Sequence, residues 1–236
     1  MKTLNELYTE AFEQHVFELS VYRNLPVDTV ERLLSRDVMD CTDFPEQHDE
    51  KLVLNFYDTD KNQLWGLSRK NAFKDCFAKA AVYVELCRRL NAGSTVLDYG
   101  SGPGIMTKAF LKAGYKVTAV DACTDIVGFL KSLKRKTLKP VHLKNWRWTR
   151  QYDVVVCSHV IEHVVNPREL LNNLVNSVKR GGLLFLDYPD KWYEPETNPE
   201  HVAPEAFKDE IFGILDKQFV VLQLNHRRIH CYKKVK

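Results

Sequence analysis

The sequence predicts an α/β fold in which a doubly wound, mostly parallel seven-stranded sheet ends in an antiparallel hairpin. From residue 95 onward, short apolar strands alternate with helical segments, as in sheets covered by helices on both faces. The last two strands follow each other too closely for a crossover helix. The 236 residues, 44% hydrophobic and 28% charged, are typical of one globular domain with or without an appendage.

The first part of the chain is expected to form a helical cap over residues 1–68, ahead of a sheet domain over 69–236. Helices are predicted over 3–22 and 28–34, with a polar loop over 37–50. A long amphipathic helix over 68–90 leads into the sheet domain. The Gly93 that follows it is typical of a helix end.

The sheet domain is predicted from its apolar runs. Strands are expected over 95–97, 116–120, 141–143, 153–157, 183–186, 219–224 and 229–233. Helices are expected between them, over 105–112, 125–134, 166–179 and 204–215. Ligands of such sheets bind outside the carboxyl ends of the strands, where the strand order reverses.

The net charge of +3 is unevenly distributed. Residues 1–60 carry 14 acidic and 5 basic side chains, whereas residues 126–152 carry eight Lys or Arg and no acid. The basic stretches are either solvated faces or a surface for an anionic substrate or a nucleic acid. No apolar run suits a membrane span, and the N-terminus lacks the apolar stretch of a signal peptide. The six scattered cysteines, without a Cys-x-x-Cys pair, favour a cytoplasmic protein.

The most specific segment is the glycine turn Asp98-Tyr99-Gly100-Ser101-Gly102-Pro103-Gly104, between a strand and a helix. Its spacing is Gly-x-Gly-x-Gly, not the Gly-x-Gly-x-x-Gly of dinucleotide sites. A second acid, Asp121, ends the next strand and can accept hydrogen bonds from a ribose diol. Asp98 would repel a bare pyrophosphate, but it suits a ligand with a cationic amino-acid end.

With these motifs, residues 70–236 resemble the class I S-adenosylmethionine-dependent methyltransferases. The resemblance implies a Rossmann-like domain in which Asp98 and the glycine turn hold the methionine end of the cofactor. It implies that Asp121 binds the ribose and that Ala122 and Cys123 lie beside the adenine. The residues that it assigns to the cofactor are Asp98, Gly100, Ser101, Gly102, Gly104, Asp121, Ala122, Asn145, Trp146 and Ser158.

The segment after the fourth strand contains the spacing His159-x-x-Glu162-His163. On a helical turn these three side chains share one face, and they can ligate a divalent metal. The segment resembles the acid-x-x-Glu-His of ubiquinone-type O-methyltransferases and small-RNA 2′-O-methyltransferases. That resemblance implies a metal and a further ligand, for which His201 is the candidate. This chain has His159 where those families have an acid, and a histidine in that place favours zinc, iron or manganese over magnesium. The alternatives are a general base without metal, His159 or His163, and a purely structural role.

The expected function is methyl transfer from S-adenosylmethionine to an oxygen or nitrogen of a small molecule, with or without a metal. Phe56, Tyr57, Asp58 and Trp65 in the cap are either contacts of the substrate or cofactor, or part of the core. One alternative is an RNA methyltransferase of the 2′-O type, and a second is a non-catalytic binding protein. The sequence predicts neither the acceptor nor the oligomeric state.

Overall fold

The computed structural model describes residues 3–35, 49–59, 63–189, 200–204, 206–222 and 230–235. Its sheet has seven strands in the order β3-β2-β1-β4-β5-β7-β6. The strands are β1 (Thr95–Tyr99), β2 (Lys116–Asp121), β3 (Leu138–His142), β4 (Tyr152–Ser158), β5 (Val178–Asp187), β6 (Phe219–Leu222) and β7 (His230–Lys234). All neighbours pair in parallel except β7, which is antiparallel to β5 and to β6. The predicted fold class is confirmed.

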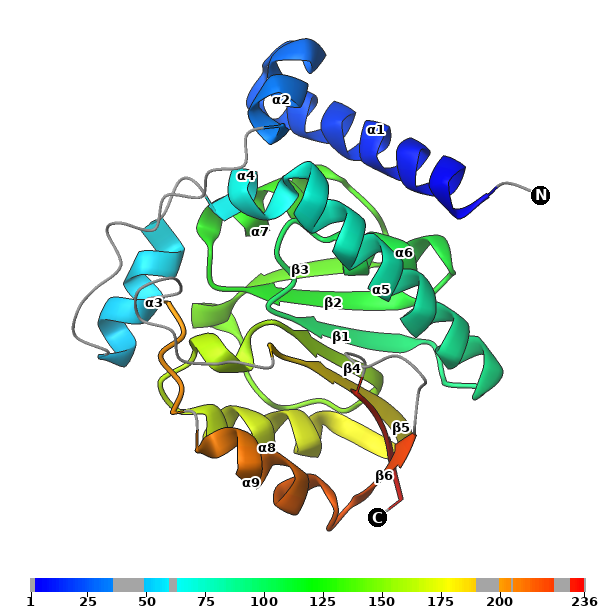
Figure 1. The fold of residues 1–236 in the computed structure, drawn as a ribbon, viewed down its shortest axis with the longest axis vertical. Helices are drawn as coiled ribbons and strands as arrows, with labels where there is room; N and C mark the ends of the chain where they lie inside the picture. Colours follow the sequence, from blue (N-terminus) through cyan, green and yellow to red (C-terminus); the bar gives the residue numbers. More distant parts are fainter. Residues whose placement is uncertain are drawn as a thin grey trace.

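The strand order reverses between β1 and β4, and this point positions the site. The chain moves outward from β1 to β2 and β3, then returns to the other side of β1 as β4 (Figure 1). The loops that follow the carboxyl ends of β1 and β4 therefore diverge and leave a crevice between them. The glycine turn follows β1, and His159 follows β4.

Helices cover both faces of the sheet. On one face, α5 (Lys70–Arg89) and α6 (Ile105–Lys112) pack on alternate strand residues such as Val154 and Val156. On the other face, α8 (Pro167–Ser177) and α9 (Phe207–Leu215) pack on Val155 and its neighbours. Because side chains alternate across a strand, the consecutive valines of β4 supply both cores.

The two N-terminal helices, α1 (Leu4–Arg23) and α2 (Val27–Leu34), lie at one end of the molecule (Figure 1). Their apolar side chains form a third core cluster with α7 (Thr124–Ser132). Tyr22 and Arg23 both bind Asp125 at the start of α7, and Lys108 pairs with Glu18 at 2.9 Å. None of the described helices is long and apolar enough to cross a membrane.

Two further helices, α3 (Glu50–Thr59) and α4 (Gln63–Ser68), were not predicted from the sequence. The predicted polar loop over 37–50 lies mostly outside the described residues, as does the end of the predicted strand over 219–224. The division of the chain into a cap of residues 1–68 and a domain of residues 69–236 stays a prediction.

The element boundaries differ most from the sequence prediction at two places. The third strand is Leu138–His142, not 141–143, and it contains Pro140; because β3 is at the edge of the sheet, the missing N–H breaks no ladder. Helix α8 ends at Ser177, and β5 begins at once. The Gly181-Gly182 pair therefore lies within β5, where a Cβ on Gly182 would meet the Asp153 carbonyl oxygen at 2.8 Å.

Candidate active site

The glycine turn connects β1 to α6 and is held by the neighbouring strand β2. The backbone N–H groups of Gly100 and Ser101 both donate to the Val120 carbonyl, at 2.8 and 3.0 Å. Gly100 has a φ of 71°, and a Cβ on it would lie 2.1 Å from Cγ2 of Val160. Glycine is therefore required here both by the backbone conformation and by the close approach of the loop after β4.

Asp98, near the end of β1, is 3% exposed. Its Oδ2 accepts a hydrogen bond of 2.6 Å from the Thr107 hydroxyl. Burial raises the pKa of Asp98 to about 6. A buried carboxylate of this kind is stabilised by a cation, so Asp98 can bind an ammonium group that enters the crevice.

Asp121, at the end of β2, binds the glycine turn directly. Its Oδ2 accepts from the Gly102 N–H at 2.8 Å, and its Oδ1 accepts from the Cys123 N–H at 2.9 Å. Burial raises the pKa of Asp121. Each carboxylate oxygen retains a second lone pair, so Asp121 can still accept hydrogen bonds from a diol.

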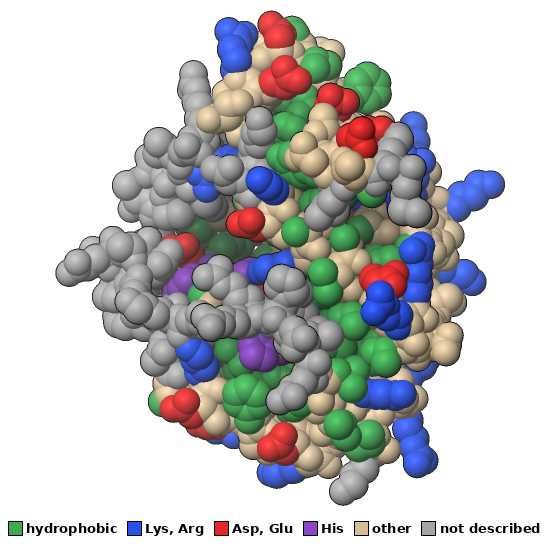
Figure 2. Space-filling model, turned by 45° about the vertical axis from the view of Figure 1, so that its right-hand side comes forward, with side chains coloured by type: hydrophobic (Ala, Val, Ile, Leu, Met, Phe, Trp, Pro, Cys, Tyr) green, Lys and Arg blue, Asp and Glu red, His purple; other side chains and the backbone are tan. Residues whose placement is uncertain are grey.

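A pocket of about 580 Å³ opens at the crevice and includes most of the residues assigned to the cofactor. The exceptions are Gly104 and Asn145, which do not line it. Its acidic lining residues are Glu50, Asp98, Asp121, Glu162, Glu169 and Glu200. No Lys or Arg is found among the lining residues in the part of the chain that the structure describes. Figure 2 shows histidine side chains within a hollow on one face of the molecule.

The aromatic wall of this pocket contains Trp146 and Trp148, which also pack against one core of the sheet. The two indoles pack edge to face, with their ring centroids 5.5 Å apart. Among the described residues, Nε1 of Trp146 is buried without a hydrogen-bond partner, as is Oγ of Ser101. Such groups cost free energy when left unpaired, which suits a site that a polar ligand completes.

The loop after β4 forms a single 3-10 turn, η2 (Ile161–His163), that carries the acid and the second histidine. Glu162 is fully buried, and its Oε1 lies 3.1 Å from Nδ1 of His159. Its Oε2 has no partner among the described residues. Burial alone would raise the pKa of Glu162, but the hydrogen bond from His159 and the nearby imidazoles lower it below its usual value. Glu162 is therefore an ionised carboxylate with one oxygen available.

His163 is held through one ring nitrogen. Its Nδ1 lies 3.1 Å from the Glu200 carbonyl oxygen and 3.0 Å from the Tyr57 hydroxyl. A carbonyl only accepts, so Nδ1 carries the proton and Nε2 keeps its lone pair. Burial lowers the pKa of His163, which keeps the ring neutral. Nε2 lies 3.9 Å from Oε1 of Glu162 and is suited to bind a metal or accept a proton.

Glu162, His163 and His201 bring one ligand atom each within 4.8 Å of one another. A carboxylate oxygen and imidazole lone pairs are the donors that a divalent ion such as Zn²⁺, Fe²⁺ or Mn²⁺ takes. The donor set therefore fits a metal. His159, predicted as a fourth member, lies outside this group: its Nε2 is 2.9 Å from the Lys79 ammonium nitrogen.

Helix α3 lines the pocket and contacts both the turn after β4 and the end of β3. Of the two alternatives left open for the cap residues, Phe56 and Tyr57 line the pocket, and Tyr57 contacts His163. Asp58 instead binds Nε2 of His142, at the end of β3, at 2.9 Å. Trp65 packs in the core cluster of α1, α2 and α7. The sequence analysis missed Lys79, Asp187 and the Glu200 carbonyl, and no motif marks these residues.

Comparison with known proteins gives one family match. A family described as a methyltransferase domain matches residues 69–216. The ubiquinone biosynthesis O-methyltransferase of Hydrogenovibrio crunogenus is 32% identical over 107 residues, which are 42% of this chain and 44% of that protein. The mitochondrial enzyme of the same name from Schizosaccharomyces pombe is 34% identical over 109 residues, 42% of this chain and 39% of that one. The chain thus spans about two fifths of the length of these relatives.

Two solved structures have the same fold. The magnesium protoporphyrin IX methyltransferase of Synechocystis, with bound S-adenosylmethionine, has a TM-score of 0.57 at 18% identity and covers 80% of this chain and 99% of its own. The N-methyltransferase NodS of Bradyrhizobium japonicum, with S-adenosylhomocysteine, has a TM-score of 0.58 at 14% identity and covers 80% and 100%. At these identities the likeness concerns the fold.

Proposed function

Since the chain belongs to the methyltransferase domain family, we propose that it transfers the methyl group of S-adenosylmethionine to an oxygen or nitrogen of a small molecule. One observation carries the proposal. A single pocket is lined by Asp98 and Asp121 and also by Glu162, His163 and His201. Cofactor-binding groups and groups that can activate an acceptor therefore share one enclosed space.

The cofactor is proposed to lie along the carboxyl ends of β1 and β2. Asp98 accepts from its ammonium group, and Asp121 accepts from the ribose hydroxyls. The indole of Trp146 offers a face for the adenine. The structures with bound cofactor or product named above support this placement by their common fold. Asn145 does not line the pocket and is not part of this proposal.

Methyl transfer is an in-line displacement, so the protein acts mainly by aligning the acceptor and excluding water. An acceptor hydroxyl must also lose its proton, and His163 Nε2 is the atom proposed to take it. Tyr57 and the Glu200 carbonyl orient the ring for that step. In the alternative version, a divalent ion held by Glu162, His163 and His201 would occupy that lone pair and would itself lower the pKa of the hydroxyl.

The test of this function combines binding and turnover. Calorimetry should show S-adenosylhomocysteine binding with a Kd in the micromolar range or tighter, on the order of 8 kcal/mol. His163→Ala should lower turnover by about 10²-fold with little change in that Kd. Loss of activity in EDTA, restored by added metal, would assign the metal role; full activity in EDTA would assign the base role. Absence of S-adenosylhomocysteine binding would refute the proposal.

The acceptor is proposed to be a small molecule because the pocket is lined by acidic side chains, which repel a polyanion such as RNA. The similar ubiquinone biosynthesis O-methyltransferases support an oxygen acceptor, and the RNA alternative gains no support from the proteins compared. The part of the cap that shapes the acceptor end is proposed to be α3 and α4, since both line the pocket and α1 and α2 do not. A cytoplasmic location remains a prediction from the cysteines.

A further inference from the structure

We propose that Lys79 is a positioning residue, which fixes the ring of His159 in one tautomer and thereby aims the Glu162 carboxylate into the pocket. This inference rests on the proposed function for its consequence but not for its geometry. Nothing in the sequence links Lys79 to the site, because it belongs to α5, 80 residues before His159.

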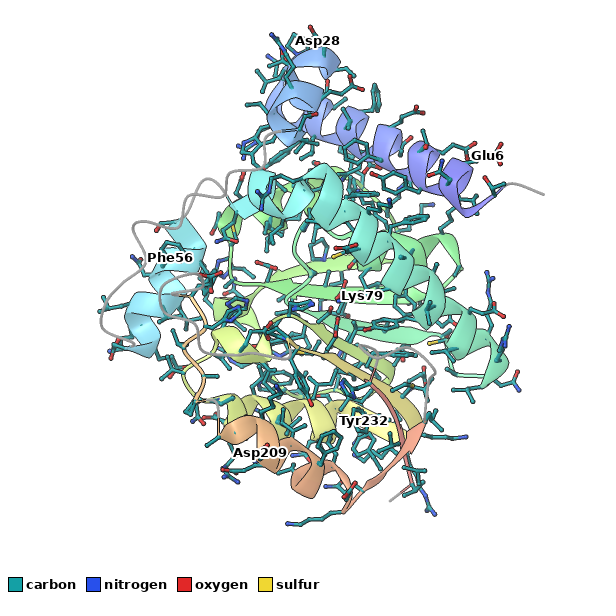
Figure 3. All side chains as sticks on the ribbon, in the orientation of Figure 1. Glu6, Asp28, Phe56, Lys79, Asp209 and Tyr232 are labelled. Carbon is teal, nitrogen blue, oxygen red and sulfur yellow. The ribbon has the colours of Figure 1, made fainter. Side chains whose placement is uncertain are left out.

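The first step is the anchoring of Lys79. Its ammonium group pairs with Asp187, the last residue of β5, whose side chain is 1% exposed. A buried carboxylate is costly without a cation, so this pair fixes the Lys79 side chain in place. The Ser158 hydroxyl also donates to Asp187, at 3.2 Å. In Figure 3, Lys79 lies between α5 and the strands of the sheet.

The second step is the orientation of the His159 ring. The Lys79 ammonium, which only donates, lies 2.9 Å from Nε2, so Nε2 must be the unprotonated nitrogen. Nδ1 then carries the proton and donates to Oε1 of Glu162 at 3.1 Å. Both ring nitrogens are engaged, so His159 has no lone pair left for a metal or for an acceptor proton.

The backbone of His159 is held in an uncommon conformation. Its φ of 52° is in the left-handed region, which is unfavourable for a residue with a side chain. Its N–H donates to the Asp187 carbonyl at 2.8 Å, so β5 holds this backbone conformation. Asp187 therefore supports His159 through its own backbone carbonyl and, by way of Lys79, through its side chain. The result is a chain of contacts from Asp187 through Lys79 and His159 to Glu162.

This chain of contacts orients the Glu162 carboxylate. Its Oε1 accepts from His159 and lies 3.9 Å from Nε2 of His163, and its Oε2 has no partner among the residues the structure describes. The carboxylate is thereby held beside His163 and His201, with which it forms the group of possible metal ligands. His159 and His163 look equivalent in the sequence, but only His163 has a ring nitrogen whose lone pair can bind a metal or accept a proton.

The experiment measures the tautomer of His159 directly, in the full ¹⁵N-labelled chain. Long-range ¹H–¹⁵N spectra at about pH 8, where neutral histidines dominate, distinguish the two ring tautomers. His159→Gln identifies the signals. The wild type should show Nδ1 protonated and Nε2 unprotonated. Lys79→Met should abolish the exclusive Nδ1–H form, because Nε2 can then carry a proton and donate it to Oδ2 of Asp187, 3.4 Å away.

Two matched variants make the result specific. Lys79→Arg keeps a cationic donor and should preserve the wild-type tautomer, and Lys74→Met removes an exposed lysine from the same helix without effect. Turnover should fall about 10–100-fold in Lys79→Met and recover in Lys79→Arg. An Nε2–H tautomer in the wild type, or an unchanged ring in a folded Lys79→Met, would overturn the inference. If the protein fails to methylate, the proposed function fails while the ring signals still decide this point.

Discussion

Replacing Gly100 by alanine tests the close contact between the glycine turn and the loop after β4. A Cβ at this position would lie 2.1 Å from Cγ2 of Val160, and the backbone would keep a φ of 71°. The left-handed backbone costs about 1–3 kcal/mol for alanine. Overpacking against Val160 costs about 1–3 kcal/mol more. The free energy of unfolding should therefore drop by about 2–6 kcal/mol, with a fall in Tm on the order of 10 °C.

The two contributions can be separated by a double-mutant cycle. In Gly100→Ala/Val160→Ala the nearest obstructing carbon is gone, so the overpacking part, about 1–3 kcal/mol, should be recovered as a coupling energy. Gly102→Ala is the control: its φ is 51°, but the nearest atom to its Cβ, in Leu67, is 3.5 Å away. It should lose only the backbone part. Urea unfolding followed by circular dichroism measures the wild type, Gly100→Ala, Val160→Ala, the double variant and the control, and a coupling energy near zero would refute the reasoning.

Three other predictions concern the carboxylates and the cap. Asp121→Ala should weaken S-adenosylhomocysteine binding by about 1–3 kcal/mol in calorimetry, because two hydrogen bonds to a charged acceptor are lost; an unchanged Kd would contradict the ribose role. The raised pKa of Asp98, about 6, means that its ionisation opposes folding: the penalty is absent below pH about 4, grows as pH rises, and is complete above pH about 6. Asp98→Asn should thus stabilise the ligand-free protein at pH 7.5 by about 1–3 kcal/mol. The affinity of the wild type for the cofactor should fall below pH about 6. If Asp98→Asn changed the free energy of unfolding equally at pH 4 and 7.5, this reasoning would be wrong. Deleting residues 1–35 should lower Tm, because it exposes Phe129 and Ile126, but should leave the Kd for S-adenosylhomocysteine within about tenfold, since α1 and α2 do not line the pocket.

The parts of the fold that the sequence predicts are those with local signals. Val154-Val155-Val156 is an uninterrupted apolar run that only a strand buried on both faces explains, and the helix start at Asn166-Pro167 has its cap and its proline in place. The third strand was displaced in the prediction because its edge position permits polar residues and Pro140. The helix α3 was missed because the polar stretch that precedes it was predicted as a loop up to residue 50, although Asp49 caps the helix: its Oδ1 accepts from the Lys51 and Leu52 N–H groups at 2.9 and 3.4 Å.

The site shows the same limit. Asp98 and the glycine turn were predicted because they are contiguous in the sequence, and Asp121 because it ends the next strand along the chain. The roles of His159 and His163 were not separable from sequence, since both positions fit a metal or a base. What distinguishes them is Lys79 on one ring and the Glu200 carbonyl on the other, at sequence separations of 80 and 37 residues. Tertiary contacts of that range leave no local pattern.

The acidic lining of the pocket has a consequence for the reaction cycle. S-adenosylmethionine is a sulfonium cation, whereas the product S-adenosylhomocysteine has a neutral sulfur. A low-dielectric pocket with carboxylates, and without Lys or Arg among its described lining residues, attracts the first more strongly than the second. The proton released by the acceptor restores the lost charge only while it stays on His163, and burial lowers the pKa of that ring. Under the proposed function, transfer of the methyl group would therefore also weaken the binding of the product, and electrostatics would favour its replacement by S-adenosylmethionine.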